Sequence, residues 1–163
     1  MLASIPALRT HVVALDTAVA DLTEKISDPV EVLMGVQLGG GTDINRALAY
    51  CQGLIRQPGE TVLVLITDLF EGGNNAEMLK RATAIVNSGV TMVTLPALGD
   101  DGAPGFDTKN GATLAARSVP SISCTPHLFP EFMAAALQKG DLDQWAGHRG
   151  LTVGQPACPQ ALE

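Results

Sequence analysis

Two stretches of the sequence place polar side chains where a sheet of parallel strands would gather them. In "LGGGTDINRAL" (38–48), three glycines stand directly before Thr42, and a helical pattern follows at once. In "LITDLFEGG" (65–73), an apolar run ends in Asp68. Adjacent glycines weaken regular structure, so they indicate an unusual turn or a close approach by another group. A hydroxyl and a carboxylate are hard oxygen donors of the kind that suits Mg²⁺. Thr42 and Asp68 are therefore candidate metal ligands.

The same two residues also have a purely structural interpretation. Thr42 or its neighbour Asp43 can cap the helix that follows, and Asp68 can cap a turn. A carboxylate at the end of a buried strand needs a cation or a helix N-terminus as its partner in either case. The residues alone leave both interpretations open.

The elements that must position these residues alternate along the chain. Residues 11–17 are apolar and β-branched, and apolar and polar residues alternate over residues 18–24. These patterns predict two strands that pair as an antiparallel hairpin. Further strands are expected at residues 61–67, 90–98 and 119–124, the first of them covered on both faces. The spacing of apolar residues and the capping residues predict helices at residues 28–37, 43–56, 75–88, 108–117 and 129–140. The helix at residues 129–140 is expected to be the last helix of the chain.

Strands that alternate with helices indicate βαβ units, and hence an α/β fold with a mostly parallel sheet. Ligands bind such sheets beyond the carboxyl ends of the strands, so the loops of interest are 38–43, 68–75 and 99–107. The domain is expected to cover residues 1–142. Residues 143–163 are polar and rich in Gly and Pro, and they are expected to form a tail.

Composition narrows the classes of partner. The net charge of −7 and the pI near 4.8 argue against nucleic acid or an anionic membrane as the main partner. No apolar run approaches the ~20 residues that cross a bilayer, and no signal peptide pattern opens the chain, so a cytoplasmic protein is expected. Cys51, Cys124 and Cys158 form no CxxC pair and are expected to be reduced thiols.

The order of these pieces resembles a von Willebrand factor A (VWA) domain from about Leu8 to Leu142. The stretches "DPVEVLMGVQLGGGTDINRAL" (28–48) and "CTPHLFPEFMAAAL" (124–137) are similar to the bacterial CoxE-type branch. The resemblance implies a three-layer α/β/α fold around a mostly parallel, Rossmann-like sheet, with strand order 3-2-1-4-5-6 in the family.

The resemblance also implies a site and a role. Thr42 would be the threonine of the metal-ion-dependent adhesion site and Asp68 its distal aspartate, binding Mg²⁺ or Mn²⁺ with a partner's carboxylate as a remaining ligand. The role implied is protein binding or complex assembly without catalysis, alongside a MoxR-type AAA+ ATPase. Residues expected around the metal or at the rim of the site are Gly41, Asp43, Glu71 and Asp101.

One departure from the family pattern is plain. The family site begins with Asp-x-Ser-x-Ser at the end of its first strand, and this sequence contains no such motif. We expect that strand and its ligands to lie upstream of Met1, which would make this a truncated VWA domain. Such a chain should bind Mg²⁺ weakly or not at all, and the incomplete sheet should favour self-association.

Two other functions stay open at this point. A metal-free scaffold would assemble proteins through its surfaces alone. A metal-assisted phosphohydrolase would use Asp68, but it needs clustered acidic residues and a general base that the sequence does not offer. The "GGGT" stretch is not a P-loop, because its glycine spacing differs and no Lys follows.

Overall fold

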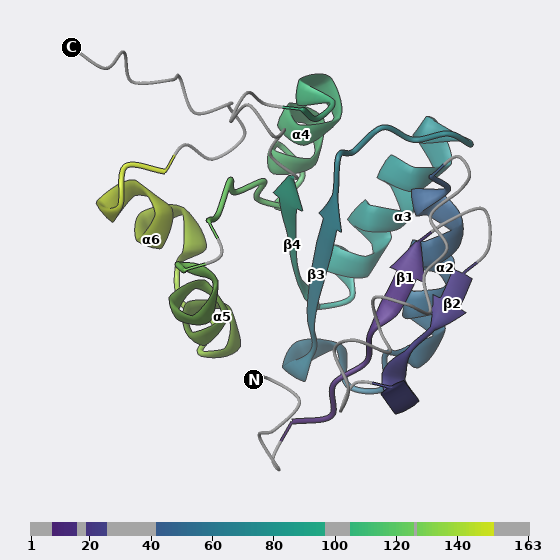
Figure 1. Ribbon diagram of the computed structural model, residues 1–163, viewed down its shortest axis with the longest axis horizontal. Coiled ribbons are helices and arrows are strands. Elements are labelled where there is room, and N and C mark those ends of the chain that lie inside the picture. Colours follow the sequence, from purple (N-terminus) through teal and green to yellow (C-terminus); the bar gives the residue numbers. More distant parts are fainter. Residues whose placement is uncertain (1–7, 16–18, 26–41, 97–104, 126, 152–163) are drawn as a thin grey trace. The chain divides into compact units, whose positions relative to one another are not determined.

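Figure 1 shows the computed structural model of the chain, in which strands alternate with helices. The structure describes residues 8–15, 19–25, 42–96, 105–125 and 127–151. The chain divides into two compact units, each described here by itself. The first unit takes Met1–Leu54 and Glu71–Met78, and the second takes Ile55–Phe70 and Leu79–Glu163.

An antiparallel hairpin opens the first unit. Strand β1 (Val13–Leu15) pairs with strand β2 (Val19–Asp21), and a short 3-10 turn, η2 (Thr23–Lys25), follows. The antiparallel pairing predicted for residues 11–17 and 18–24 is confirmed.

Helix α2 (Ile44–Leu54) is the main helix described in the first unit. Its apolar residues recur every three or four positions, which buries Ile44 and Leu48 on one face. The helix predicted over residues 43–56 is therefore confirmed. The short helix predicted over residues 28–37 lies outside the described residues.

A polar contact at the surface joins β2 to α2. The Tyr50 hydroxyl in α2 donates a hydrogen bond of 2.7 Å to Oδ2 of Asp21, and the Thr23 N–H donates one of 2.9 Å to Oδ1. Hydrogen bonding by Thr23 first, and by Tyr50 second, lowers the pKa of Asp21 from 3.8 to about 2. The ionised carboxylate thus links two elements of the first unit.

A parallel pair of strands forms the sheet of the second unit. Strand β3 (Val62–Thr67) pairs in register with strand β4 (Thr91–Pro96). Helix α3 (Asn75–Asn87), whose first turn belongs to the first unit, connects them (Figure 1). A parallel pair needs a crossover of this kind, since a tight turn cannot return the chain to the same end. The elements predicted over residues 61–67, 75–88 and 90–98 are confirmed.

Helices follow β4 in the rest of the second unit. Helix α4 (Thr108–Ala115) and helix α5 (Phe129–Leu137) confirm the predictions for residues 108–117 and 129–140. A short 3-10 turn, η3 (Pro58–Glu60), precedes β3. The strand predicted over residues 119–124 is reduced to a single parallel bridge between Ser121 and Thr94.

A further helix, α6 (Leu142–His148), occupies the start of the region predicted as a tail, residues 143–163. The Asp141 side chain caps its first turn. The Trp145 ring then lies edge-on to Phe132 of α5, with centroids 5.6 Å apart, and the Arg149 guanidinium lies 4.7 Å from the centre of the Trp145 ring. Aromatic burial therefore holds α6 on α5, which the polar composition of the region did not predict.

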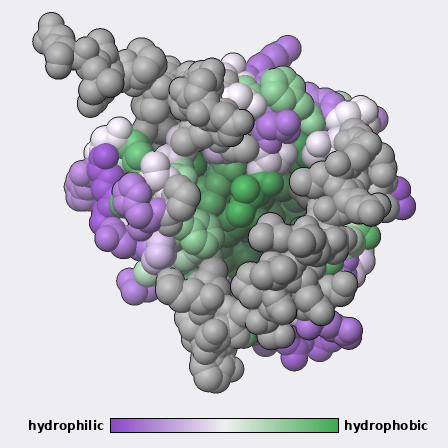
Figure 2. Space-filling view, in the orientation of Figure 1, coloured by the Kyte–Doolittle hydropathy of each residue, from purple (hydrophilic) through white to green (hydrophobic). Residues whose placement is uncertain are grey.

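Strand β3 is less covered than its apolar sequence predicts. Leu65 is buried, whereas Ile66 on the opposite face is 63% exposed, and Val62 and Val64 on that same face are half-buried. Figure 2 shows hydrophobic residues gathered over β3 and β4. The prediction that residues 61–67 are covered on both faces is wrong at Ile66. Within the described residues β3 pairs along one edge only.

The contact between Asp21 and Tyr50 predicts a pH-dependent effect. Because the folded pKa of Asp21 lies below the unfolded value, its contribution to stability is present above about pH 4 and is lost as the pH falls toward 2. The variant Y50F removes one donor and should raise the pKa of Asp21. The difference in Tm between wild type and Y50F should be largest above pH 4 and should shrink toward pH 2.

Thermal melts across this pH range and an NMR titration of the Asp21 carboxyl carbon check the expectation. An Asp21 pKa that Y50F leaves unchanged would contradict it.

Candidate functional site

The carboxylate of Asp68 stands directly after β3 in the second unit and is half-buried. Its Oδ1 accepts a hydrogen bond of 3.1 Å from the Phe70 N–H and one of 3.4 Å from the Thr67 hydroxyl. Leu69, which lies between Asp68 and Phe70 in the chain, has a left-handed φ of 60°. No donor within the described ranges meets Oδ2. The turn therefore holds one carboxylate oxygen and leaves the other available to a ligand.

Thr42 lies in the loop before α2, in the first unit, and its backbone rather than its side chain is engaged. Its carbonyl accepts a hydrogen bond of 2.8 Å from the Gly72 N–H. The N-cap of α2 is Asp43, whose Oδ1 accepts from the Arg46 N–H at 2.8 Å. Among the residues that the structure describes, the Thr42 hydroxyl meets no partner. Of the two capping residues considered, Asp43 therefore caps α2, and the Thr42 hydroxyl has no partner among the described residues.

Glu71 has a role that the sequence did not reveal. Its Oε2 accepts hydrogen bonds from the N–H groups of Ile44 (2.8 Å) and Asn45 (3.3 Å) at the start of α2. Its Oε1 accepts one of 3.0 Å from the Gly73 N–H. A carboxylate at this end of a helix satisfies unpaired N–H groups and interacts favourably with the helix dipole. Glu71 is therefore a helix-capping side chain supplied from another part of the chain, and both its oxygens are engaged.

Two glycines after Glu71 allow this close approach. A Cβ at Gly72 would lie 3.0 Å from the Thr42 carbonyl oxygen, and one at Gly73 would lie 2.8 Å from Oε1 of Glu71. Both distances are shorter than ordinary contacts of a side chain. At Gly72 the neighbour is the backbone of the Thr42 loop, so a glycine suits the close packing there. At Gly73 the neighbour is the end of the flexible Glu71 side chain, which can move aside.

The remaining site predictions have separate outcomes. Gly41 and Asp101 lie outside the described residues. Thr42 belongs to the first unit and Asp68 to the second, and an ion shared between them stays a prediction. Within the described residues, no group of three or more His, Cys, Asp or Glu side chains is arranged to hold a metal. The two available oxygens are nevertheless of the type that Mg²⁺ and Mn²⁺ bind.

Comparison with known proteins identifies the family. The model of the family described as "VWA domain containing CoxE-like protein" matches residues 1–133. The chain belongs to the CoxE-like branch of the VWA family. A protein of Escherichia coli (strain K12), described as "Uncharacterized protein YehP", is 39% identical over 134 residues, which is 82% of this chain and 35% of the relative. The chain thus spans about a third of that relative's length. No solved structure matches.

The family assignment confirms an α/β fold, to which the parallel β3–β4 pair and its connecting helix conform. None of the helices in the described part of the chain is long and apolar enough to cross a membrane.

The thiols that the structure describes offer this VWA domain no activated nucleophile. Cys51 and Cys124 are free and half-buried. Burial raises the pKa of both, which favours the protonated and less reactive form. Cys158 lies outside the described residues.

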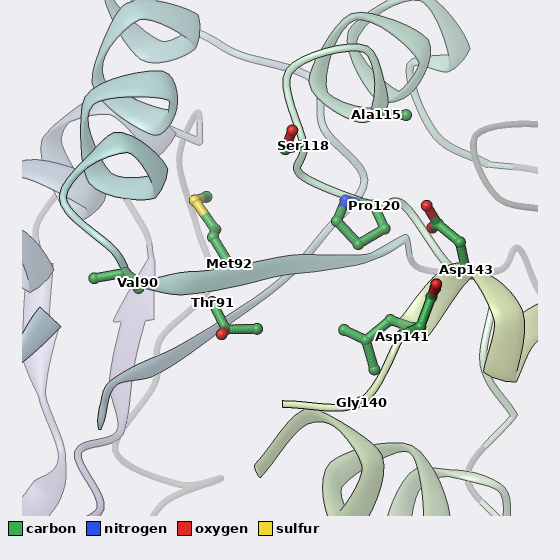
Figure 3. A pocket seen from close by; sticks show the side chains of 10 residues that line it. Val90, Thr91, Met92, Ala115, Ser118, Pro120, Gly140, Asp141 and Asp143 are labelled. Carbon is green, nitrogen blue, oxygen red and sulfur yellow. The ribbon is translucent and has the colours of Figure 1, made fainter. Parts of the chain in front are cut away.

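A pocket of about 370 Å³ lies in the second unit at the start of β4, beside Thr91 and Met92 (Figure 3). Asp141 and Asp143 contribute its carboxylates, and Asp141 already caps α6. Asp68 follows the carboxyl end of β3, and parallel strands in register place their carboxyl ends together, so the pocket and Asp68 lie at opposite ends of the β3–β4 pair. The pocket is therefore separate from Asp68, the residue predicted to bind the metal.

The close approach at Gly72 predicts a stability effect. In G72A the new methyl group would press on the Thr42 carbonyl, and the required backbone shift should lower the free energy of unfolding by about 1–3 kcal/mol. The control is G53A in α2, where nothing lies within 4 Å of the added Cβ. Because Gly53 lies in the last turn of α2, that change should stabilise the protein by at most about 0.5–1 kcal/mol.

Urea unfolding of the two variants beside the wild type measures both changes. Equal effects of G72A and G53A would show that residues 71–73 do not pack closely on the Thr42 loop.

Proposed function

We propose that this VWA domain is a non-catalytic module that binds a protein partner, and that Asp68 and Thr42 contribute oxygen ligands to a Mg²⁺ or Mn²⁺ ion at the contact. The observation that carries the proposal lies at the end of β3. There, a carboxylate with one unengaged oxygen stands two residues before Phe70, whose side chain is 55% exposed. The ion, when bound, would supply a positive charge for a carboxylate of the partner.

Exposed apolar side chains support a protein partner over a small polar substrate. Phe70 and Ile66 lie within four positions of each other in the second unit, and both are more than half exposed. Aromatic side chains are enriched among the residues that dominate the energy of protein interfaces. A catalytic role would need a general base or an activated nucleophile near Asp68, and the described residues around its turn supply backbone donors instead.

The finer parts of the proposal come from the family resemblance. They are a cytoplasmic location, a MoxR-type AAA+ ATPase as the partner, and the three-layer arrangement with the family's strand order. A metal-free scaffold is the competing function, because the sequence has no Asp-x-Ser-x-Ser to complete the ligand set. In that case Phe70 would contribute to binding and the ion would not.

Metal titration tests the ligand assignment. Two protein oxygens should hold Mg²⁺ only at millimolar levels, since the ion gives up its water reluctantly. Mn²⁺ should broaden the NMR signals of residues near Asp68 in the wild type, and D68N and T42A should each abolish the effect. The control D143N removes an exposed carboxylate of α6 and should change nothing. Micromolar binding would mean that further ligands exist, and broadening that survives D68N would refute the assignment.

A binding assay with a purified MoxR-type ATPase tests the role. F70S should weaken the complex by about tenfold or more, as expected when an aromatic anchor is lost at a cost above ~1.4 kcal/mol. EDTA and D68N should weaken it as well if the ion takes part. Weakening by F70S alone would favour the metal-free scaffold, and an unchanged affinity in F70S would exclude this surface from the interface.

A further inference from the structure

Asn110, at the start of α4, is a buried polar side chain directed at the turn that follows Asp68. It is 4% exposed, and its Nδ2 donates to the Leu69 carbonyl (3.0 Å) and to Oδ2 of Asp107 (3.2 Å). Both amide hydrogens are therefore engaged. Burying a polar amide is unfavourable unless it is hydrogen-bonded, and here the acceptor is a carbonyl 41 positions earlier in the chain.

Asp107 secures the preceding carbonyl of the same turn. Its N–H donates a hydrogen bond of 2.8 Å to the Asp68 carbonyl. Its Oδ1 accepts from the N–H groups of Lys109 and Asn110, both at 3.0 Å, as the N-cap of α4. Two consecutive carbonyls, those of Asp68 and Leu69, are thus bound by the first turn of one helix and its cap.

The turn needs this support because of its backbone conformation. Leu69 is fully buried with a φ of 60°, a conformation that leucine rarely adopts. The left-handed turn directs the Phe70 N–H to Oδ1 of Asp68. If Leu69 relaxed to a negative φ, that hydrogen bond would break and the carboxylate would lose its orientation.

We propose that Asn110, together with Asp107, is a positioning residue for Asp68. The Asn110 amide holds the Leu69 carbonyl, the held turn presents the Phe70 N–H, and that donor orients the carboxylate so that Oδ2 is left for the ligand. The inference rests on the proposed metal role of Asp68 for its purpose, but the contacts through which it acts do not involve a metal. It also gives α4 a link to the site, since the residues that bind the turn begin the helix.

The test combines a readout without metal and a readout with metal, both on the full chain. The variant N110A removes the amide, and N110S serves the same purpose if N110A does not fold. One control, T113A, removes an exposed hydrogen bond within α4. A second control, V119A, truncates a fully buried residue of the same unit whose N–H bonds the Leu114 carbonyl and not the turn, and it should lower stability through lost packing.

Without metal, amide hydrogen exchange at Phe70 and Asp107 should be at least about tenfold faster in N110A than in V119A, because the turn opens locally. With Mn²⁺, N110A should weaken binding at Asp68 by about tenfold, the usual effect of removing a residue that orients a metal ligand. Neither control should change the affinity.

The outcomes separate the two proposals. The positioning role would be overturned if the amide exchange rates of Phe70 and Asp107 in N110A equalled those in V119A. It would also be overturned if N110A bound Mn²⁺ as tightly as the wild type. A wild type that shows no Mn²⁺ effect, beside an N110A whose turn exchanges faster, would refute the proposed metal function and leave Asn110 as the residue that holds the Asp68 turn.

Discussion

The chain that leaves β3 must satisfy its backbone polar groups outside the sheet, and this constraint organises the structure around it. Residues 67–73 carry two carboxylates three positions apart and make almost no regular secondary structure. Each carboxylate accepts a hydrogen bond from at least one backbone N–H group instead. Asp68 accepts from its own turn, and Glu71 accepts from the start of α2 and from Gly73. The loop is thus held by charge-assisted hydrogen bonds, which are stronger than those between neutral groups.

The two carboxylates differ in what they leave unused. Glu71 has three backbone donors spread over both oxygens, so it is committed to the fold of the first unit. Asp68 meets donors of the described residues through one oxygen only. This division explains why a carboxylate near a proposed ion need not be a ligand. The number of hydrogen bonds that an oxygen already accepts decides its availability more directly than its position in a motif.

Local patterns predicted the regular elements, and long-range contacts account for most of what they missed. The spacing of apolar residues placed α2 and α3, and the β-branched run placed β3, because these signals act within a few positions. The roles of Glu71 and Asn110 depend on acceptors or donors 27 and 41 positions away, which no local pattern encodes. For α6, a local signal did exist. Asp141 before Leu142 is a typical N-cap, but the surrounding Gly and polar residues obscured it.

Two apolar side chains around Asp68, those of Ile66 and Phe70, stay more than half exposed in the part of the chain that the structure describes. Thr67 and Leu69, which lie between Ile66 and Phe70 in the chain, are both buried. The Thr67 hydroxyl accepts a hydrogen bond from the Leu69 N–H, and the Leu69 carbonyl accepts one from Asn110. Ile66 and Phe70 gain little from folding in the described structure, since most of their surface stays in contact with water. Full burial of such a side chain is worth roughly 1.5–3 kcal/mol, and covering the part that is still exposed here would supply somewhat more than half of that. A protein surface laid over the end of β3 would recover that free energy at the place where the unengaged oxygen of Asp68 stands, and a small hydrophilic ligand would not.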